Sequence, residues 1–166
     1  MIKALDKKEI DKKLEKIYGM KLPRGQIIQQ SKEKLRIFTG DVSEKELNFL
    51  SSIVNVEVIG LYFAFQKEKE FRLSFDALFL ADEATKNILE LDDKQFKEWI
   101  AGGEIDIDTN NIKHGEDDSE DSDQSAKKSD NEYIFLKYHD NVVGCGKVTE
   151  NRVLNFVPKE RRLLKL

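Results

Sequence analysis

The spacing of apolar positions predicts three helices, each opened by a residue that can cap its first turn. The caps are Asp6, Ser43 and Asp92, and the residues three positions later, Glu9, Glu46 and Gln95, complete capping boxes. Apolar residues then recur at spacings of three and four: Ile10, Leu14 and Ile17 in the first helix, Leu47, Leu50 and Ile53 in the second, and Phe96, Trp99 and Ile100 in the third. Each helix is therefore expected to bury one face and to expose the other.

Short runs of β-branched and aromatic residues between these helices predict strands. They fall at residues 26–29, 35–38, 54–65, 71–75, 87–91, 104–108, 133–138, 142–148 and 153–157. Gly60, inside the longest run, is expected to mark a bulge or the close approach of another backbone. Ser74 is expected to cap a short helix that ends near Leu80. We assign this mixture of helices and strands to the α+β class.

The pattern breaks at residues 110–132, which contain no aromatic residue and almost no apolar one. We expect this segment to be disordered, because it cannot bury enough surface to offset the entropy lost on ordering. Within it the acidic tract, residues 115–132, carries eight acidic and two basic side chains. Such a tract is a solubilising insertion, or it mimics RNA or docks a basic ribosomal partner. The chain is divided accordingly into domains 1–91 and 92–166, with the insertion inside the second.

The net charge of −4 at pH 7 does not exclude RNA binding, because the negative charge is concentrated in that tract. Residues 133–166 carry seven basic and three acidic side chains, so this segment is locally basic. No apolar run reaches the ~18 residues that span a membrane, and the N-terminus lacks the apolar core of a signal peptide. We therefore expect a cytoplasmic protein without a membrane partner.

The basic segment holds the residues best suited to binding. Gly144 and Gly146 remove two side chains from one predicted strand, which favours the close approach of an RNA backbone or of another strand in a crowded barrel. The cations that follow are Lys147, Arg152, Lys159, Arg161 and Arg162, the last three behind Pro158, which fixes the chain direction. Clustered Lys and Arg side chains position phosphates. The aromatic residues Trp99, Tyr138 and Phe156 suit either stacking on bases or filling the core.

Patterns typical of enzymes are weak. The sequence at 144–147 lacks the spacing of a phosphate-binding loop. Cys145 as a nucleophile requires a base, but His139 lies across a predicted turn and His114 lies in the predicted disorder. One cysteine and two histidines so far apart predict no disulfide and no metal site, and no cofactor is expected. A small RNA-modifying enzyme that uses Cys145 remains as an alternative.

Four motifs in the C-terminal half follow the pattern of a known family. They are Phe96, Trp99, Gly103 and Glu104 around the third helix, the strand at 134–138, Gly144-Cys145-Gly146-Lys147-Val148, and the segment from Leu154 to Arg162 with Asn155. In this order they resemble the PUA-like module of the rRNA cytosine-5 methyltransferases of the Nop/Sun/Fmu family, a small β-barrel that binds RNA. The sequence departs from the pattern at Leu154, where the family has a basic residue, and in the acidic insertion.

Residues 1–91 resemble the pre-PUA domain of Nip-seven-type ribosome-biogenesis factors, through the leading helix, Phe71-Arg72-Leu73 and the transition near Leu91. Together the halves resemble stand-alone archaeal ribosome-biogenesis proteins that have the RNA-binding module and lack the methyltransferase domain. The resemblance implies a non-catalytic protein that binds structured RNA, with rRNA as the first candidate and tRNA as the second. A separate methyltransferase or a ribosomal protein is the implied protein partner.

The residues assigned to RNA binding are Gly144, Gly146, Lys147, Arg152, Asn155, Lys159, Arg161 and Arg162. No catalytic residue, metal ligand or cofactor is assigned. The rival hypothesis is a protein–protein adaptor, in which the barrel face binds a protein and the acidic tract docks a basic ribosomal partner.

Overall fold

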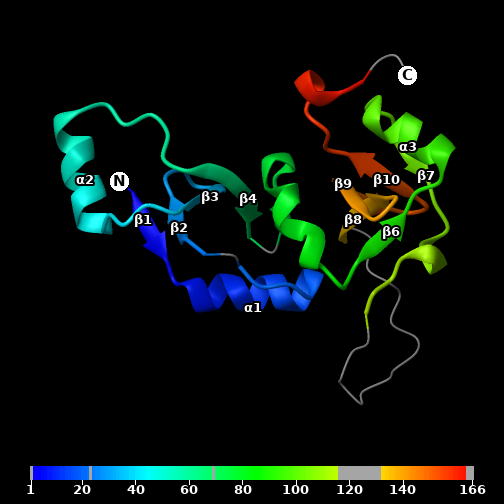
Figure 1. Cartoon of the computed structure of the whole chain (residues 1–166), viewed down its shortest axis with the longest axis horizontal. Helices are drawn as coiled ribbons and strands as arrows, with labels where there is room; N and C mark the ends of the chain where they lie inside the picture. Colours follow the sequence, from blue (N-terminus) through cyan, green and yellow to red (C-terminus); the bar gives the residue numbers. More distant parts are fainter. Residues whose placement is uncertain (1, 23, 69, 116–131, 164–166) are drawn as a thin grey trace.

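The computed structural model describes residues 2–22, 24–68, 70–115 and 132–163, which form a mixed fold of α-helices and two five-stranded sheets. Figure 1 shows the two sheets side by side, with the first helix running along the first sheet. The acidic tract, apart from Gly115 and Glu132, lies outside the described residues. Among the helices that are described, none is both long enough and apolar enough to cross a membrane.

The first sheet is an antiparallel meander whose strands pair in the order of the chain. They are β1 (Lys3–Leu5), β2 (Gln26–Gln29), β3 (Lys34–Phe38), β4 (Leu61–Lys67) and β5 (Glu70–Leu73). The helix α1 (Lys7–Tyr18) buries Ile10, Leu14 and Tyr18 in the core of this sheet. Asp6 caps α1 as predicted, but the predicted capping box is wrong, because Glu9 pairs instead with Lys13 at 3.1 Å.

The helix α2 (Glu44–Ile53) has the predicted capping box between Ser43 and Glu46. It contacts the first sheet through a single turn, where Leu47 packs with Ile2, Ile28 and Ile59. The prediction that Leu50 and Ile53 face inward is wrong, since 46% of Leu50 and 65% of Ile53 is exposed. A helix that touches the sheet through one turn cannot bury the residues of its next turn.

The predicted strand over 54–65 is confirmed only in its second half, because β4 begins at Leu61. Gly60 marks a close approach of two backbones, as predicted. Its φ of 69° is in the left-handed region, and a Cβ at this position would overlap the carbonyl group of Ile37. Only glycine fits both conditions without strain.

The second sheet has the order β6 (Ile88–Glu90), β8 (Tyr133–Tyr138), β9 (Asn141–Thr149), β10 (Arg152–Asn155) and β7 (Ile105–Asp106). Of the strands in the described part of the chain, β6 and β8 alone pair in parallel. Among the described strands, β6 and β7 are the two edges of this sheet, so the predicted small barrel is a curled half-barrel. The helix α3 (Asp93–Ile100) packs on this sheet through the buried Trp99, and the predicted capping box of Asp92 with Gln95 is confirmed.

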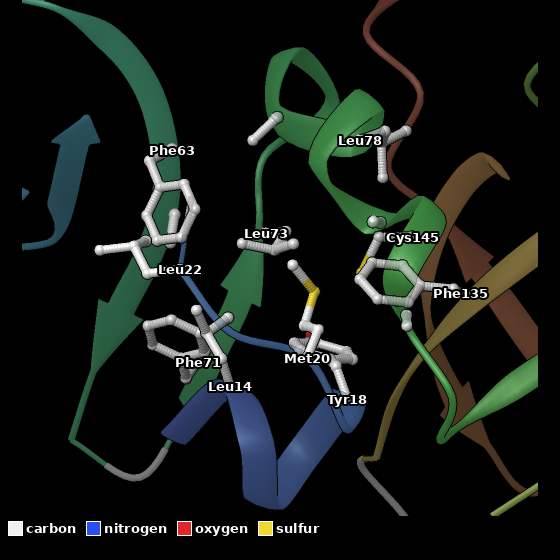
Figure 2. Packing of buried hydrophobic residues seen from close by; sticks show 14 of the residues in the cluster. Leu14, Tyr18, Met20, Leu22, Phe63, Phe71, Leu73, Leu78, Phe135 and Cys145 are labelled. Atoms are coloured by element: carbon white, nitrogen blue, oxygen red, sulfur yellow. The ribbon is translucent and has the colours of Figure 1, made fainter. Parts of the chain in front are cut away.

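The two sheets share one hydrophobic core. The short helix η1 (Phe75–Glu83) lies between them, and Tyr18 at the end of α1 stacks on Phe135 of β8 with ring centroids 4.3 Å apart. Figure 2 shows Phe135 and Cys145 of the second sheet in one cluster with Leu73 of the first sheet and with Met20, which follows α1. The sheets are therefore held as one body by burial of apolar surface.

Trp99 explains the two glycines of β9. Its ring is fully buried, and its Nε1 donates a hydrogen bond to the carbonyl of Val143 at 3.2 Å. A Cβ at Gly144 would overlap this indole, and a Cβ at Gly146 would lie 3.0 Å from Cη2 of Trp99 and would overlap Val153. The space left by the glycines is thus filled by Trp99, as expected for a crowded barrel and not for an approaching RNA backbone.

This packing predicts a coupling between Gly144 and Trp99. We expect Gly144→Ala to lower the free energy of unfolding by about 1–3 kcal/mol through overpacking. In a Trp99→Phe background the cost should be much smaller, because phenylalanine lacks the indole nitrogen Nε1, the Trp99 atom nearest to Gly144. Urea denaturation of the four proteins measures both costs. Equal costs in the two backgrounds would contradict the packing role of Gly144.

Candidate nucleic-acid interface

The segment after β10 carries two exposed cations of the predicted set. The short helix η3 (Lys159–Arg161) follows Pro158, and its side chains point away from the core. Lys159 is exposed and has no ion-pair partner among the described residues. Arg161 lies 3.8 Å from Asp76 of η1, with 63% of its side chain exposed. Both charges are thus accessible to a phosphate.

Arg162 has a different role. Its Nε donates a hydrogen bond to the carbonyl of Val157 at 3.0 Å, and its guanidinium covers Gly102, where a Cβ would overlap it. The backbone of the next residue, Leu163, donates to the carbonyl of Ile100 at the end of α3. Arg162 therefore anchors the C-terminal segment on α3 rather than standing free for a ligand.

Lys147 joins the two sheets. Its Nζ lies 2.9 Å from Oε1 of Glu70 in β5 and 5.6 Å from the ring centroid of Tyr133. This hydrogen bond lowers the pKa of the Glu70 carboxyl and raises the pKa of the Lys147 ammonium. Lys147 is therefore already paired, and only 18% of its side chain is exposed.

Arg152 is also matched by acidic groups. Its Nε donates to Asp106 of β7 at 2.8 Å, and Glu104 lies 3.8 Å from its Nη1. The side chain remains 60% exposed, but two carboxylates offset its charge. A phosphate at this edge of the sheet would meet a locally acidic surface.

Asn155 and the glycine pair are parts of the scaffold. The Asn155 amide donates to the carbonyls of Trp99 and Gly103 at 2.7 and 2.8 Å, and its Oδ1 accepts from the Val157 backbone. Asn155 thus ties the C-terminal end of α3 to the segment after β10. Gly144 and Gly146 are buried. We therefore remove these three residues from the proposed contacts.

The three aromatic residues predicted either to stack on bases or to fill the core also differ in their surroundings. Trp99 is core, and Tyr138 stacks on Phe96 with centroids 3.9 Å apart. Phe156 alone remains partly exposed beside a cation, since the guanidinium of Arg72 lies 4.4 Å from its ring centroid. Arg72 belongs to β5, so the first sheet contributes a cation to the exposed surface around Phe156.

These contributions from the first sheet were not predicted from the sequence. The signal was present, because Lys34 and Arg36 alternate with buried Leu35 and Ile37 along β3. Alternation of this kind places charged side chains on one face of a strand. The predicted binding residues all lie in the C-terminal segment, so none of them falls on the outward face of the first sheet.

Cys145 lies in the core beside Tyr18 and Phe135 and is 5% exposed. Burial raises the pKa of the Cys145 thiol to about 12. A thiol of this kind is protonated at neutral pH and is a poor nucleophile. The alternative of an enzyme that uses Cys145 therefore has no support in the geometry of this site.

Comparison with protein families agrees with this geometry. Residues 86–163 match the family model described as the methyltransferase RsmF PUA domain. This stretch is a PUA-like module. It contains all of the second sheet, α3 and η3, and no strand of the first sheet. The module is related to rRNA methyltransferases, and a PUA domain suggests RNA binding. No curated protein matches the chain significantly.

The burial of Cys145 predicts that its thiol is inert in the folded protein. A pKa raised from an ordinary value of 9.0 to about 12 lowers the thiolate fraction at pH 8 roughly a thousandfold. Iodoacetamide should therefore label the native protein very slowly and the urea-unfolded protein rapidly. The chain has one cysteine, so the total mass increase reports this site alone. Rapid labelling of the native protein would show that the site is accessible.

Proposed function

We propose that this chain binds structured RNA through its PUA-like module and catalyses no reaction. The observation that carries the proposal is the match of residues 86–163 to a PUA domain, on a module that exposes Lys159 and Arg161. These two cations lie on η3 behind a rigid proline, and both are accessible to phosphates although Arg161 also lies 3.8 Å from Asp76. rRNA is the first candidate ligand and tRNA the second.

The proposed biological role is an accessory one in ribosome biogenesis. The module is related to domains of rRNA methyltransferases, so a separate methyltransferase or a ribosomal protein is a reasonable partner. We further propose that the first sheet with α1 and α2 is a pre-PUA-like domain, that the protein is archaeal, and that it acts in the cytoplasm. Ultraviolet crosslinking in cell extract, followed by sequencing of the bound RNA, identifies the ligand.

Salt dependence tests the phosphate contacts. We expect RNA affinity to fall with salt, and Lys159→Ala with Arg161→Ala to reduce the slope of log K against log salt by roughly one unit per lost contact. Lys8→Ala with Lys12→Ala is the matched control, because these exposed lysines of α1 carry the same charge away from the module. Fluorescence anisotropy with a labelled rRNA hairpin measures each slope. A double variant that binds with an unchanged slope would remove η3 from the interface.

An adaptor function is the second candidate, and one observation favours it. The outward face of α2 exposes Phe49, Leu50, Ile53 and Val54, with 67% of Phe49 and 65% of Ile53 accessible. Adjacent exposed apolar residues of this kind often mark a protein-binding surface. This surface is separate from the PUA-like module, so RNA and a protein could bind at the same time.

One variant of α2 separates protein binding from RNA binding. If α2 docks a protein, Phe49→Ser with Ile53→Ser should abolish capture of that protein and leave the RNA affinity of the hairpin within about twofold, because neither side chain is buried. Co-purification from extract and anisotropy measure the two effects. Unchanged protein capture by this variant would reject α2 as the docking surface.

A further inference from the structure

The first sheet presents an open face on the side opposite α1. At the β1–β2 end this face is covered by α2, through Leu47 on Ile28. Ile28 pairs in register with Arg36, and Arg36 with Tyr62, so the same face continues over β3 and β4. Over β3 and β4 this face carries partly exposed charged and aromatic side chains instead of buried aliphatic ones.

A β-bulge arranges the aromatic residues on this face. The register between β3 and β4 shifts between Leu35 and Arg36. Phe63 and Ala64 are both buried with the core under α1, although they are adjacent. Tyr62 and Phe65, which flank them, therefore both emerge on the opposite face. In the row that crosses the sheet, Lys34 pairs with Phe65 and Phe65 pairs with Arg72.

Cations lie against these rings. Lys34 is 5.7 Å from the centroid of Tyr62, and Arg72 is 5.2 Å from that of Phe65 and 4.4 Å from that of Phe156. Phe156 follows β10, so this arrangement crosses from the first sheet to the PUA-like module. We call it the cation–aromatic stripe, and its members are Lys34, Arg36, Tyr62, Phe65, Arg72 and Phe156.

Arg72 is the most informative member. Its guanidinium lies over two aromatic rings, and its side chain has no hydrogen-bond acceptor or ion-pair partner among the described residues. Aromatic faces fix the plane of a guanidinium while leaving its N–H donors at the edge. A fixed fork of free donors matches the oxygens of a phosphate.

The local charge balance favours an anionic ligand. The nearby carboxylates each pair with a cation outside the stripe: Glu33 with Lys67 at 3.2 Å, Glu70 with Lys147 at 2.9 Å, and Asp76 with Arg161 at 3.8 Å. Among the described residues Lys34 and Arg72 form no ion pair, and Arg36 donates to the carbonyl of Gly60 at 3.0 Å. The charge of Arg72 adds only a smaller contribution to the hydrogen bond of Lys147 in lowering the pKa of Glu70. The stripe therefore keeps a net positive charge.

We propose that the cation–aromatic stripe binds an unpaired RNA strand that continues from the structured RNA on the module. This inference rests on the proposed function. Arg72 forks to a phosphate, Lys34 and Arg36 neutralise neighbouring phosphates, and the exposed parts of Tyr62, Phe65 and Phe156 contact unstacked bases. Aromatic rings on a sheet stack on bases that are free of pairing, whereas a duplex presents only its backbone and grooves. Arg161, beside Asp76, links the stripe to η3.

The test compares two RNA probes on the full chain. One is a blunt hairpin, and the other is the same hairpin with an unpaired tail of about ten nucleotides. We expect the tail to increase the affinity of the wild-type protein. Arg72→Lys should weaken binding of the tailed probe roughly tenfold and leave binding of the blunt probe unchanged. Lysine keeps the positive charge but lacks the forked pair of N–H donors.

Two further variants make the result specific. Arg24→Lys is the matched control, because Arg24 is exposed and lies outside the stripe. Lys34→Glu, at an exposed position, tests the same surface in case Arg72→Lys lowers the melting temperature. It should also abolish the gain from the tail.

The outcomes separate this inference from the proposed function. If the wild type binds both probes equally, or if the gain from the tail survives in Arg72→Lys and Lys34→Glu, the stripe does not bind RNA, while the proposed function stands. If those variants instead lose a protein in co-purification, the stripe is a protein surface and the inference is overturned. If the wild type binds neither probe, the proposed function fails as well.

Discussion

The stacking of Tyr18 on Phe135 is the contact on which the rest of the architecture depends. It joins the end of α1 to β8, which lies between β6 and β9 in the second sheet. Around this contact Met20, Leu73 and Cys145 are excluded from water. This contact gives the second sheet a cover on one face, while Trp99 and α3 cover the other. A sheet covered on both faces buries its apolar residues without closing into a barrel.

The same contact holds the charged residues of the first sheet close to those of the PUA-like module. Because the sheets share a core, Phe156 of the module reaches Arg72 of β5, and Lys147 reaches Glu70. A flexible linker between two domains would not hold side chains at such distances. The first sheet is thus held rigidly against the module and places Arg72 and Glu70 beside its residues.

Local patterns predicted much of the fold but little of the electrostatics. The helix caps at Ser43 and Asp92 and the strand over 133–138 depend on neighbouring residues, and these predictions are confirmed. The exposure of Ile53 and the bulge that turns Tyr62 and Phe65 to one face depend on tertiary packing. Whether a cation is paired depends on carboxylates distant in sequence. The count of basic residues in the C-terminal segment therefore could not show that Lys147 and Arg152 are already paired.

The two ends of the acidic tract meet at one point of the second sheet. Lys113 bridges to Ile88, the Glu132 carbonyl accepts from Val148, and His114 lies 3.8 Å from Glu132. An insertion that leaves and returns at neighbouring positions can lengthen or shorten without moving a strand. Even a wholly flexible segment would cost only about 0.6 kcal/mol for each doubling of its length. Evolution can therefore vary the amount of negative charge attached to this protein almost independently of its fold.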